Sequence, residues 1–127
     1  GGAPAPNGTI ASARDWFKLL NAQAACMAQW EALFTEYDFV LAPPAPVLAV
    51  PHSDKAVFRG TLSIGGDDEP GSCGLVWSGM ATFPGLPATV LPVGESGGLP
   101  CGMQVIGPRW ADLDCIAAAK AIGEVLA

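Results

Sequence analysis

The sequence has few charged residues, and the basic ones are scarce. Only 14% of the 127 residues are charged, and six Lys and Arg against twelve Asp and Glu leave a net charge of −6. The basic residues are scattered singly, so the basic patch typical of proteins that bind nucleic acid or anionic membranes is absent. No apolar run reaches the roughly 18 residues that a membrane span needs. We therefore expect no nucleic-acid partner and no membrane partner.

Histidine is nearly absent, and the cysteines lack metal-binding spacing. His52 is the single histidine, and the four cysteines form no C-x-x-C motif. A zinc site is therefore not expected, and His52, in a proline-rich stretch, is interpreted as a solvated loop residue. Cys26 lies within one predicted helix and Cys115 in the first turn of another, which is typical of reduced thiols that serve as small hydrophobic residues. No N-terminal signal pattern is visible, so a cytoplasmic protein is expected. The cysteines are Cys26, Cys73, Cys101 and Cys115.

Apolar residues, glycine and proline are abundant instead. Half of the residues are hydrophobic, which excludes a disordered chain, and 16 glycines and 12 prolines predict many turns. The length suits one domain. We interpret residues 1–11 as a flexible lead-in and 12–127 as one incomplete domain, because the start resembles that of a fragment.

The pattern of apolar residues predicts an α/β protein with about three helices and three or more strands. One apolar stripe (Trp16, Leu20, Ala24, Met27, Trp30 and Phe34) indicates a long helix that Ser12 and Asp15 begin. The acidic run 67–69 beside two glycines is interpreted as a solvated turn rather than a calcium loop. A β-hairpin is expected near 88–107, and nearly continuous apolar strands predict burial on both faces. The predicted elements are helices over 12–36, 73–82 and 112–126 and strands over 37–42, 58–64, 88–93 and 101–107. The last helix is expected to bury Leu113, Ile116, Ala119, Ile122 and Leu126.

The stretch Gly94-Glu95-Ser96-Gly97-Gly98 fits the nucleophile-elbow pattern G-x-S-x-G. Such an elbow needs a helix directly after the serine. Two glycines and Pro100 follow instead, and both disfavour a helix. The serine-protease alternative, with His52, also fails because two β-barrels do not fit in this chain. We therefore predict that Ser96 lies in the loop of a hairpin and is not a nucleophile.

The sequences that flank this loop resemble the amidase signature family near its C-terminal end. Residues 83–94 read FPGLPATVLPVG, and residues 98–107 read GLPCGMQVIG. Further upstream, YDFVLAP (37–43) resembles the strand that runs into the family's proline-rich loop, and LVWSGMA (75–81) resembles the helix before the GLPA turn. The four pieces occur in the family's order, and the resemblance extends over roughly residues 12–126.

This resemblance implies an amide hydrolase with a Lys–Ser–Ser triad on a mixed α/β sheet and with no metal or organic cofactor. The lysine-bearing strand and the glycine- and serine-rich signature of the family are missing from this sequence. The resemblance therefore implies that this chain is the C-terminal portion of an amidase. Such a portion acts on a small-molecule amide only as part of the complete enzyme. No catalytic residue is expected in this chain. The alternative is a non-catalytic, amidase-derived binding or interaction module.

The same resemblance suggests Trp77, Met80 and Pro44 as residues that line the substrate pocket. Trp77 and Met80 are three residues apart and share one side of a short helix, which also fits a core position. Gln104, in the middle of a strand, either hydrogen-bonds across the sheet or faces a pocket. Three helices cover only part of a buried sheet, so we expect exposed apolar surface that is covered by self-association or by the missing N-terminal portion.

Overall fold

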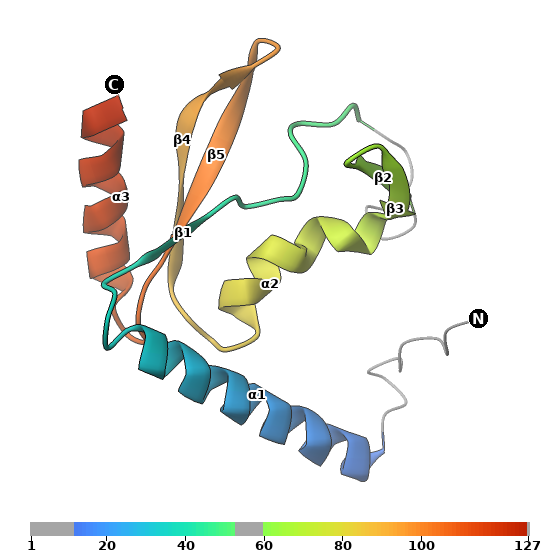
Figure 1. Ribbon diagram of the computed structural model, residues 1–127, viewed down its shortest axis with the longest axis vertical. Helices are drawn as coiled ribbons and strands as arrows, with labels where there is room; N and C mark the ends of the chain where they lie inside the picture. Colours follow the sequence, from blue (N-terminus) through green and yellow to red (C-terminus); the bar gives the residue numbers. More distant parts are fainter. Residues whose placement is uncertain (1–11, 53–59, 127) are drawn as a thin grey trace.

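A computed structural model describes residues 12–52 and 60–126 of the chain. Helix α3 (Asp112–Leu126) lies beside a three-stranded sheet, and a two-stranded hairpin lies apart from it (Figure 1). This mixture of helices and strands confirms the predicted α/β class and the hairpin near 88–107. The predicted lead-in, 1–11, lies outside the described residues, as does the start of the strand predicted at Phe58. The elements are α1 (Ala13–Leu33), β1 (Val40–Ala42), β2 (Thr61–Ile64), β3 (Asp67–Pro70), the 3-10 helix η3 (Gly71–Leu75), α2 (Val76–Thr82), β4 (Ala88–Ser96), β5 (Leu99–Ile106) and α3 (Asp112–Leu126).

The sheet has β5 at its centre, with β1 and β4 antiparallel to it on either side. Val105 and Ile106 are both fully buried. Because successive strand residues point to opposite faces, both faces of the sheet are covered at this point. Burial on both faces does not extend through the sheet, since Leu41 is 53% exposed and Val90 is 58% exposed. The prediction of doubly buried strands is therefore right only at the end of β5.

Helix α3 packs against the β4–β5 hairpin and closes the core. Leu91, Val105 and Ala119 form the buried cluster, and Figure 1 shows α3 running beside the hairpin. The predicted buried face of this helix is wrong at three of its five positions, because Leu113, Ile116 and Leu126 are 80%, 54% and 55% exposed. Apolar residues occur on nearly every side of α3, so their period did not determine which side faces the sheet. The partly buried residues around the cluster are Phe39, Val93, Met103, Ala118 and Ile122.

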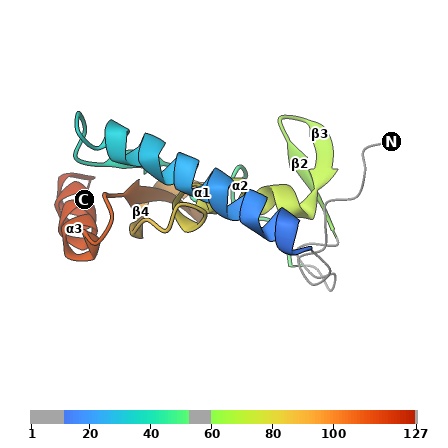
Figure 2. The ribbon, with the colours of Figure 1, turned by 90° about the horizontal axis from the view of Figure 1, so that it is seen from below.

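Helix α1 is long, and the described residues cover little of it. It begins as predicted, since the Asp15 backbone N–H donates to Ser12 Oγ at 3.2 Å. Figure 2 shows its C-terminal end beside α3 and its N-terminal end far from that helix. The predicted apolar stripe is half-buried only from Met27 onwards, at Met27, Trp30 and Phe34. The rings of Trp30 and Phe34 stack with their centroids 5.7 Å apart. Trp16 remains 55% exposed because α1 extends beyond the sheet.

The small hairpin β2–β3 corrects the prediction for the acidic run. Residues 67–69 are exposed, as expected, but they form strand β3 rather than a turn. Gly65 and Gly66 have φ values of 65° and 100° and make the whole turn. Asp67 therefore already pairs with Ile64.

Candidate functional site

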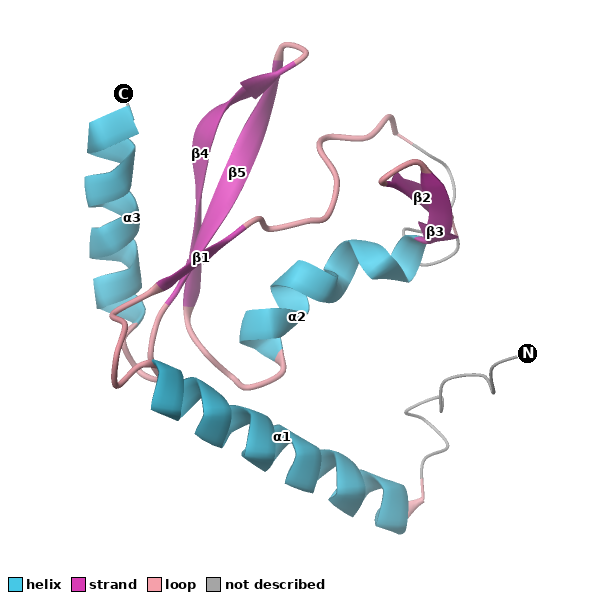
Figure 3. Ribbon diagram, in the orientation of Figure 1, coloured by secondary structure: helices cyan, strands magenta, loops and turns pink. Residues whose placement is uncertain are grey.

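An open hollow of about 760 Å³ lies where the proline-rich loop after β1 passes α2 and β5. Figure 3 shows this loop as the pink segment that leaves β1 and runs towards the β2–β3 hairpin. None of the described residues that line the hollow has a charged side chain. They are Pro43, Pro44, Ala45, Pro46, Val47, Leu48, Ala49, Val50, Ile64, Trp77, Pro100, Cys101 and Gly102.

Two features of the sequence place the loop against the sheet. Pro43 and Pro44 follow β1 directly, and the missing N–H of proline ends strand pairing there. Gly102 then lets the loop come close to β5, since a Cβ at that position would lie 3.3 Å from Pro44 Cγ and 3.4 Å from Val90 Cγ1. A Cβ at residue 102 would therefore require the side chain of Pro44 or Val90 to shift by a few tenths of an ångström.

Gln104 ties the two walls of the hollow together. Its Nε2 donates to the backbone oxygen of Pro43 at 2.9 Å and to that of Trp77 at 3.0 Å. The side chain is only 3% exposed. Because an unpaired buried amide costs free energy, both hydrogen bonds are needed to make this position favourable. The sequence left the role of Gln104 open, and the structure shows that it bonds to the loop and to α2 at once.

The structure brings two of the three predicted pocket residues together. Pro44 and Trp77 line the same hollow, whereas Met80 is not among the described residues that line it. The predicted helix over 73–82 is divided into η3 and α2, and Trp77 lies in the first turn of α2. Sequence reasoning missed Leu48 and Cys101 as lining residues. Leu48 lies two residues after Pro46 and Cys101 directly follows Pro100, and nearby prolines indicate a loop but not what it faces.

Ser96 does not lie in a nucleophile elbow. It is the last residue of β4 and pairs with Leu99, the first residue of β5. Gly97 and Gly98 have φ values of 59° and 76° and make the two-residue turn between them. Strand, turn and strand confirm the predicted hairpin, although the loop is shorter than expected because residues 94–96 belong to β4. His52 is exposed in the proline-rich loop.

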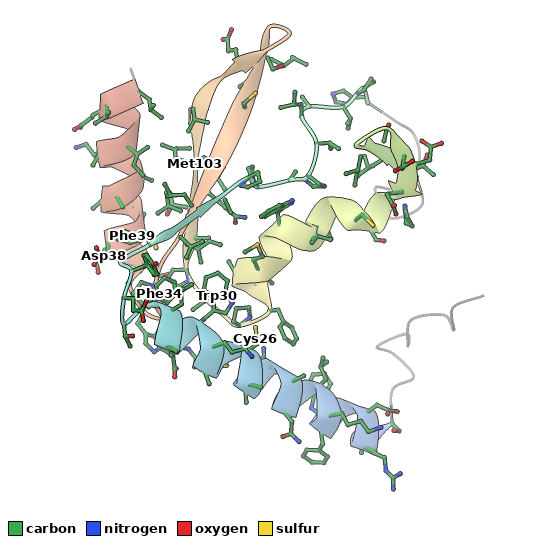
Figure 4. All side chains as sticks on the ribbon, in the orientation of Figure 1. Cys26, Trp30, Phe34, Asp38, Phe39 and Met103 are labelled. Atoms are coloured by element: carbon green, nitrogen blue, oxygen red, sulfur yellow. The ribbon has the colours of Figure 1, made fainter. Side chains whose placement is uncertain are left out.

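A second hollow, of about 530 Å³, lies between the end of α1 and helix α3. Phe34, Asp38 and Phe39 line it at the junction of α1 and β1, and alanines of α3 form its other wall. Figure 4 labels these three side chains where the chain turns from α1 towards β1. The two lining carboxylates, Asp38 and Asp114, are exposed. This arrangement offers no nucleophile beside a base.

Among the described residues, Cys115 is the one cysteine whose side chain is fully buried. Burial raises its pKa, and the nearby carboxylates of Asp112 and Asp114 raise it further. Its Sγ donates weakly to the backbone oxygen of Pro87 at 3.7 Å. Since only a thiolate is a strong nucleophile, Cys115 serves as a packing residue.

The described residues contain neither a group of side chains that could hold a metal ion nor a helix that could cross a membrane. Within residues 12–52 and 60–126, no three His, Cys, Asp or Glu side chains gather where they could hold a metal ion. In the same ranges, no helix is both long enough and apolar enough to cross a membrane.

The chain shares its sequence pattern and its fold with amide-cleaving enzymes. The Amidase family model matches residues 5–116. A structure of a bacterial aryl acylamidase of the amidase signature family aligns with a TM-score of 0.73 and 29% identity, covering 92% of this chain and 24% of that one. A second amidase structure aligns with a TM-score of 0.82 over 94% of this chain, and its 18% identity shows the fold alone. Together these matches show that the mixed α/β fold of this chain is that of one part of the amidase structures. The chain belongs to the amidase signature family.

Relatives of known sequence are similar over most of the chain but are much longer. One subunit of the glutamyl-tRNA(Gln) amidotransferase of Moorella thermoacetica is 32% identical over 110 residues, which are 84% of this chain and 20% of the relative. The same subunit from Neisseria meningitidis is 34% identical over 96 residues, 73% of this chain and 18% of the relative. The chain thus spans about a fifth of the length of these relatives.

Proposed function

We propose that this chain is the C-terminal portion of an amidase-family hydrolase that cleaves a carboxylic amide to an acid and ammonia or an amine. The observation that carries the proposal is the family match over residues 5–116, together with an aligned length of about a fifth of the relatives. The triad that the family uses would then lie in the other part of the protein. This chain would contribute one wall of the substrate pocket, through Pro44 and Trp77, with Met80 supporting that wall from α2.

An alternative function, a binding module without catalysis, has one observation in its favour. The hollow and the Gln104 hydrogen bonds that fix it are made by this chain alone. A ligand could therefore bind here without the rest of an enzyme.

We also propose a cytoplasmic location, because none of the four cysteines pairs in a disulfide.

The reading frame upstream of Gly1 and the intact mass of the native protein separate the two functions. We expect an upstream lysine-bearing strand and serine-rich signature, and we expect the complete protein to release ammonia or an amine from simple amides. Ser96→Ala should leave this activity unchanged, since Ser96 lies beside a hairpin turn. A native protein of about 12.9 kDa, the mass of this chain, would contradict the enzyme and favour the binding module.

A further inference from the structure

We infer that the hollow beside the proline-rich loop binds an apolar, uncharged group of the substrate amide, such as a short alkyl or aryl group. This inference rests on the proposed function and adds the chemical class of the substrate. A zwitterionic amide such as glutamine is the contrasting class.

The lining residues of the hollow favour an apolar ligand over a charged one. The described lining residues are alanine, proline, valine, leucine, isoleucine, tryptophan, glycine and one cysteine, whose thiol is a weak hydrogen-bond donor. The polar side-chain groups among these residues are the Trp77 indole N–H and the Cys101 thiol, so a carboxylate or ammonium group in the hollow would lose its hydration without gaining a charged partner among them. Burial without a partner is costly for a charge, whereas an alkyl group gains from leaving water.

The hollow has exposed apolar side chains in its lining and is large enough for a small molecule. Leu48 and Val50 are 58% and 56% exposed although both face the hollow. The described residues of this chain therefore leave apolar surface beside the hollow uncovered. The size of the hollow, about 760 Å³, lies in the range of sites for small molecules, roughly 300–1,000 Å³.

The walls of the hollow are held in place by hydrogen bonds and by prolines. Gln104 holds the Pro43 and Trp77 backbones through two hydrogen bonds, and the prolines limit how far the loop can rearrange. A wall that is already in place costs little entropy to order when a ligand binds. The hollow can therefore select its ligand by shape and polarity.

The test measures kcat/KM of the complete protein for acetamide, butanamide, hexanamide and glutamine. We expect kcat/KM to rise by about fourfold for each added methylene while the chain fits, the fold-change that burial of one CH₂ corresponds to. Glutamine should be hydrolysed no better than acetamide. Leu48→Asp should flatten the dependence on chain length. Leu113→Asp is the matched control, since Leu113 is 80% exposed on α3 and does not line the hollow.

Two outcomes would overturn the inference: a kcat/KM that is independent of chain length, or an equal loss in Leu48→Asp and Leu113→Asp. If no amide is hydrolysed, the proposed function fails and a binding titration still decides the inference. In that titration, 1-hexanol is added and tryptophan fluorescence is followed. Saturable binding that is lost in Leu48→Asp and kept in Leu113→Asp supports an apolar site, and the absence of saturable binding overturns it.

Discussion

A single glycine permits the packing between the end of β5 and α3. A Cβ at Gly107 would overlap Cys115 Sγ and would also lie 3.4 Å from two ring carbons of Phe39. Cys115 is fully buried and cannot turn away into solvent. Gly107 therefore belongs to the core even though it has no side chain to bury.

We predict that Gly107→Ala destabilises the chain by roughly 1–3 kcal/mol, as overpacking of a core does. In a Cys115→Ala background, which removes the sulfur, the same change should cost less. Urea denaturation of the four proteins gives the coupling between the two sites. Equal costs in both backgrounds would show that Cys115 is not what the new methyl group meets. Gly94→Ala is a suitable control, since a Cβ there meets nothing within 4 Å.

At the residue scale, the sequence indicated which residues lie near the hollow better than it indicated their hydrogen bonds. It placed Pro44 and Trp77 near one another through the family resemblance, and the two residues do line one hollow. The hydrogen bonds of Gln104 could not be predicted, because their acceptors are backbone oxygens 61 and 27 residues away. Any backbone oxygen can serve as such an acceptor, so the sequence carries no signal for the choice.

At the scale of elements, the turn between β4 and β5 depends on two left-handed residues. Gly97 and Gly98 both have positive φ, which makes a type I′ turn that asparagine–glycine also favours. The strands on either side pair along residues 88–96 and 99–106, so the turn sets their register.

We predict that Gly97→Asn leaves the free energy of unfolding nearly unchanged, whereas Gly98→Val lowers it by about 1–2 kcal/mol. The reason is that a β-branched residue is strained in the left-handed region. Thermal or urea unfolding of both variants, beside the unmodified chain, measures the difference. Similar effects of the two substitutions would mean that the turn does not need this conformation.

The sequence predicted the existence of the elements more reliably than their faces. Ser12 marks the start of α1 because a capping hydrogen bond is local. The side of α3 that faces the sheet was predicted poorly, because apolar residues nearly surround the helix and tertiary packing makes the choice. The run 67–69 was mistaken for a turn because its acidic side chains are solvated in a strand as well as in a loop.

Across the whole molecule, large apolar side chains remain at the surface. Trp110 is 83% exposed, Leu113 80% and Val125 85%. The sequence predicted such exposure from the shortage of helices around an apolar sheet, and the described residues confirm it. Which surface covers these side chains depends on contacts outside the chain, and for that reason its sequence does not determine the partner.

We predict that the 127-residue chain, prepared by itself, self-associates at micromolar concentration, because association would remove many exposed large apolar side chains from water. Light scattering should show a mass above 12.9 kDa that rises with concentration. Val125→Asp should lower that mass if the C-terminal end of α3 is involved, since Val125 is 85% exposed. A monomer that behaves well at all concentrations would contradict the prediction.

The central position of β5 also determines when the sheet can form. β1 and β4 both pair with β5 and not with each other, and β5 follows both of them in the sequence. Until residues 99–106 have left the ribosome, β1 has no partner in this sheet and the proline-rich loop has no strand to rest on. Pairing Val40 with Ile106 closes a loop of more than sixty residues, a contact that forms late and slowly. The earlier strands therefore depend on the arrival of β5 for protection from aggregation during synthesis.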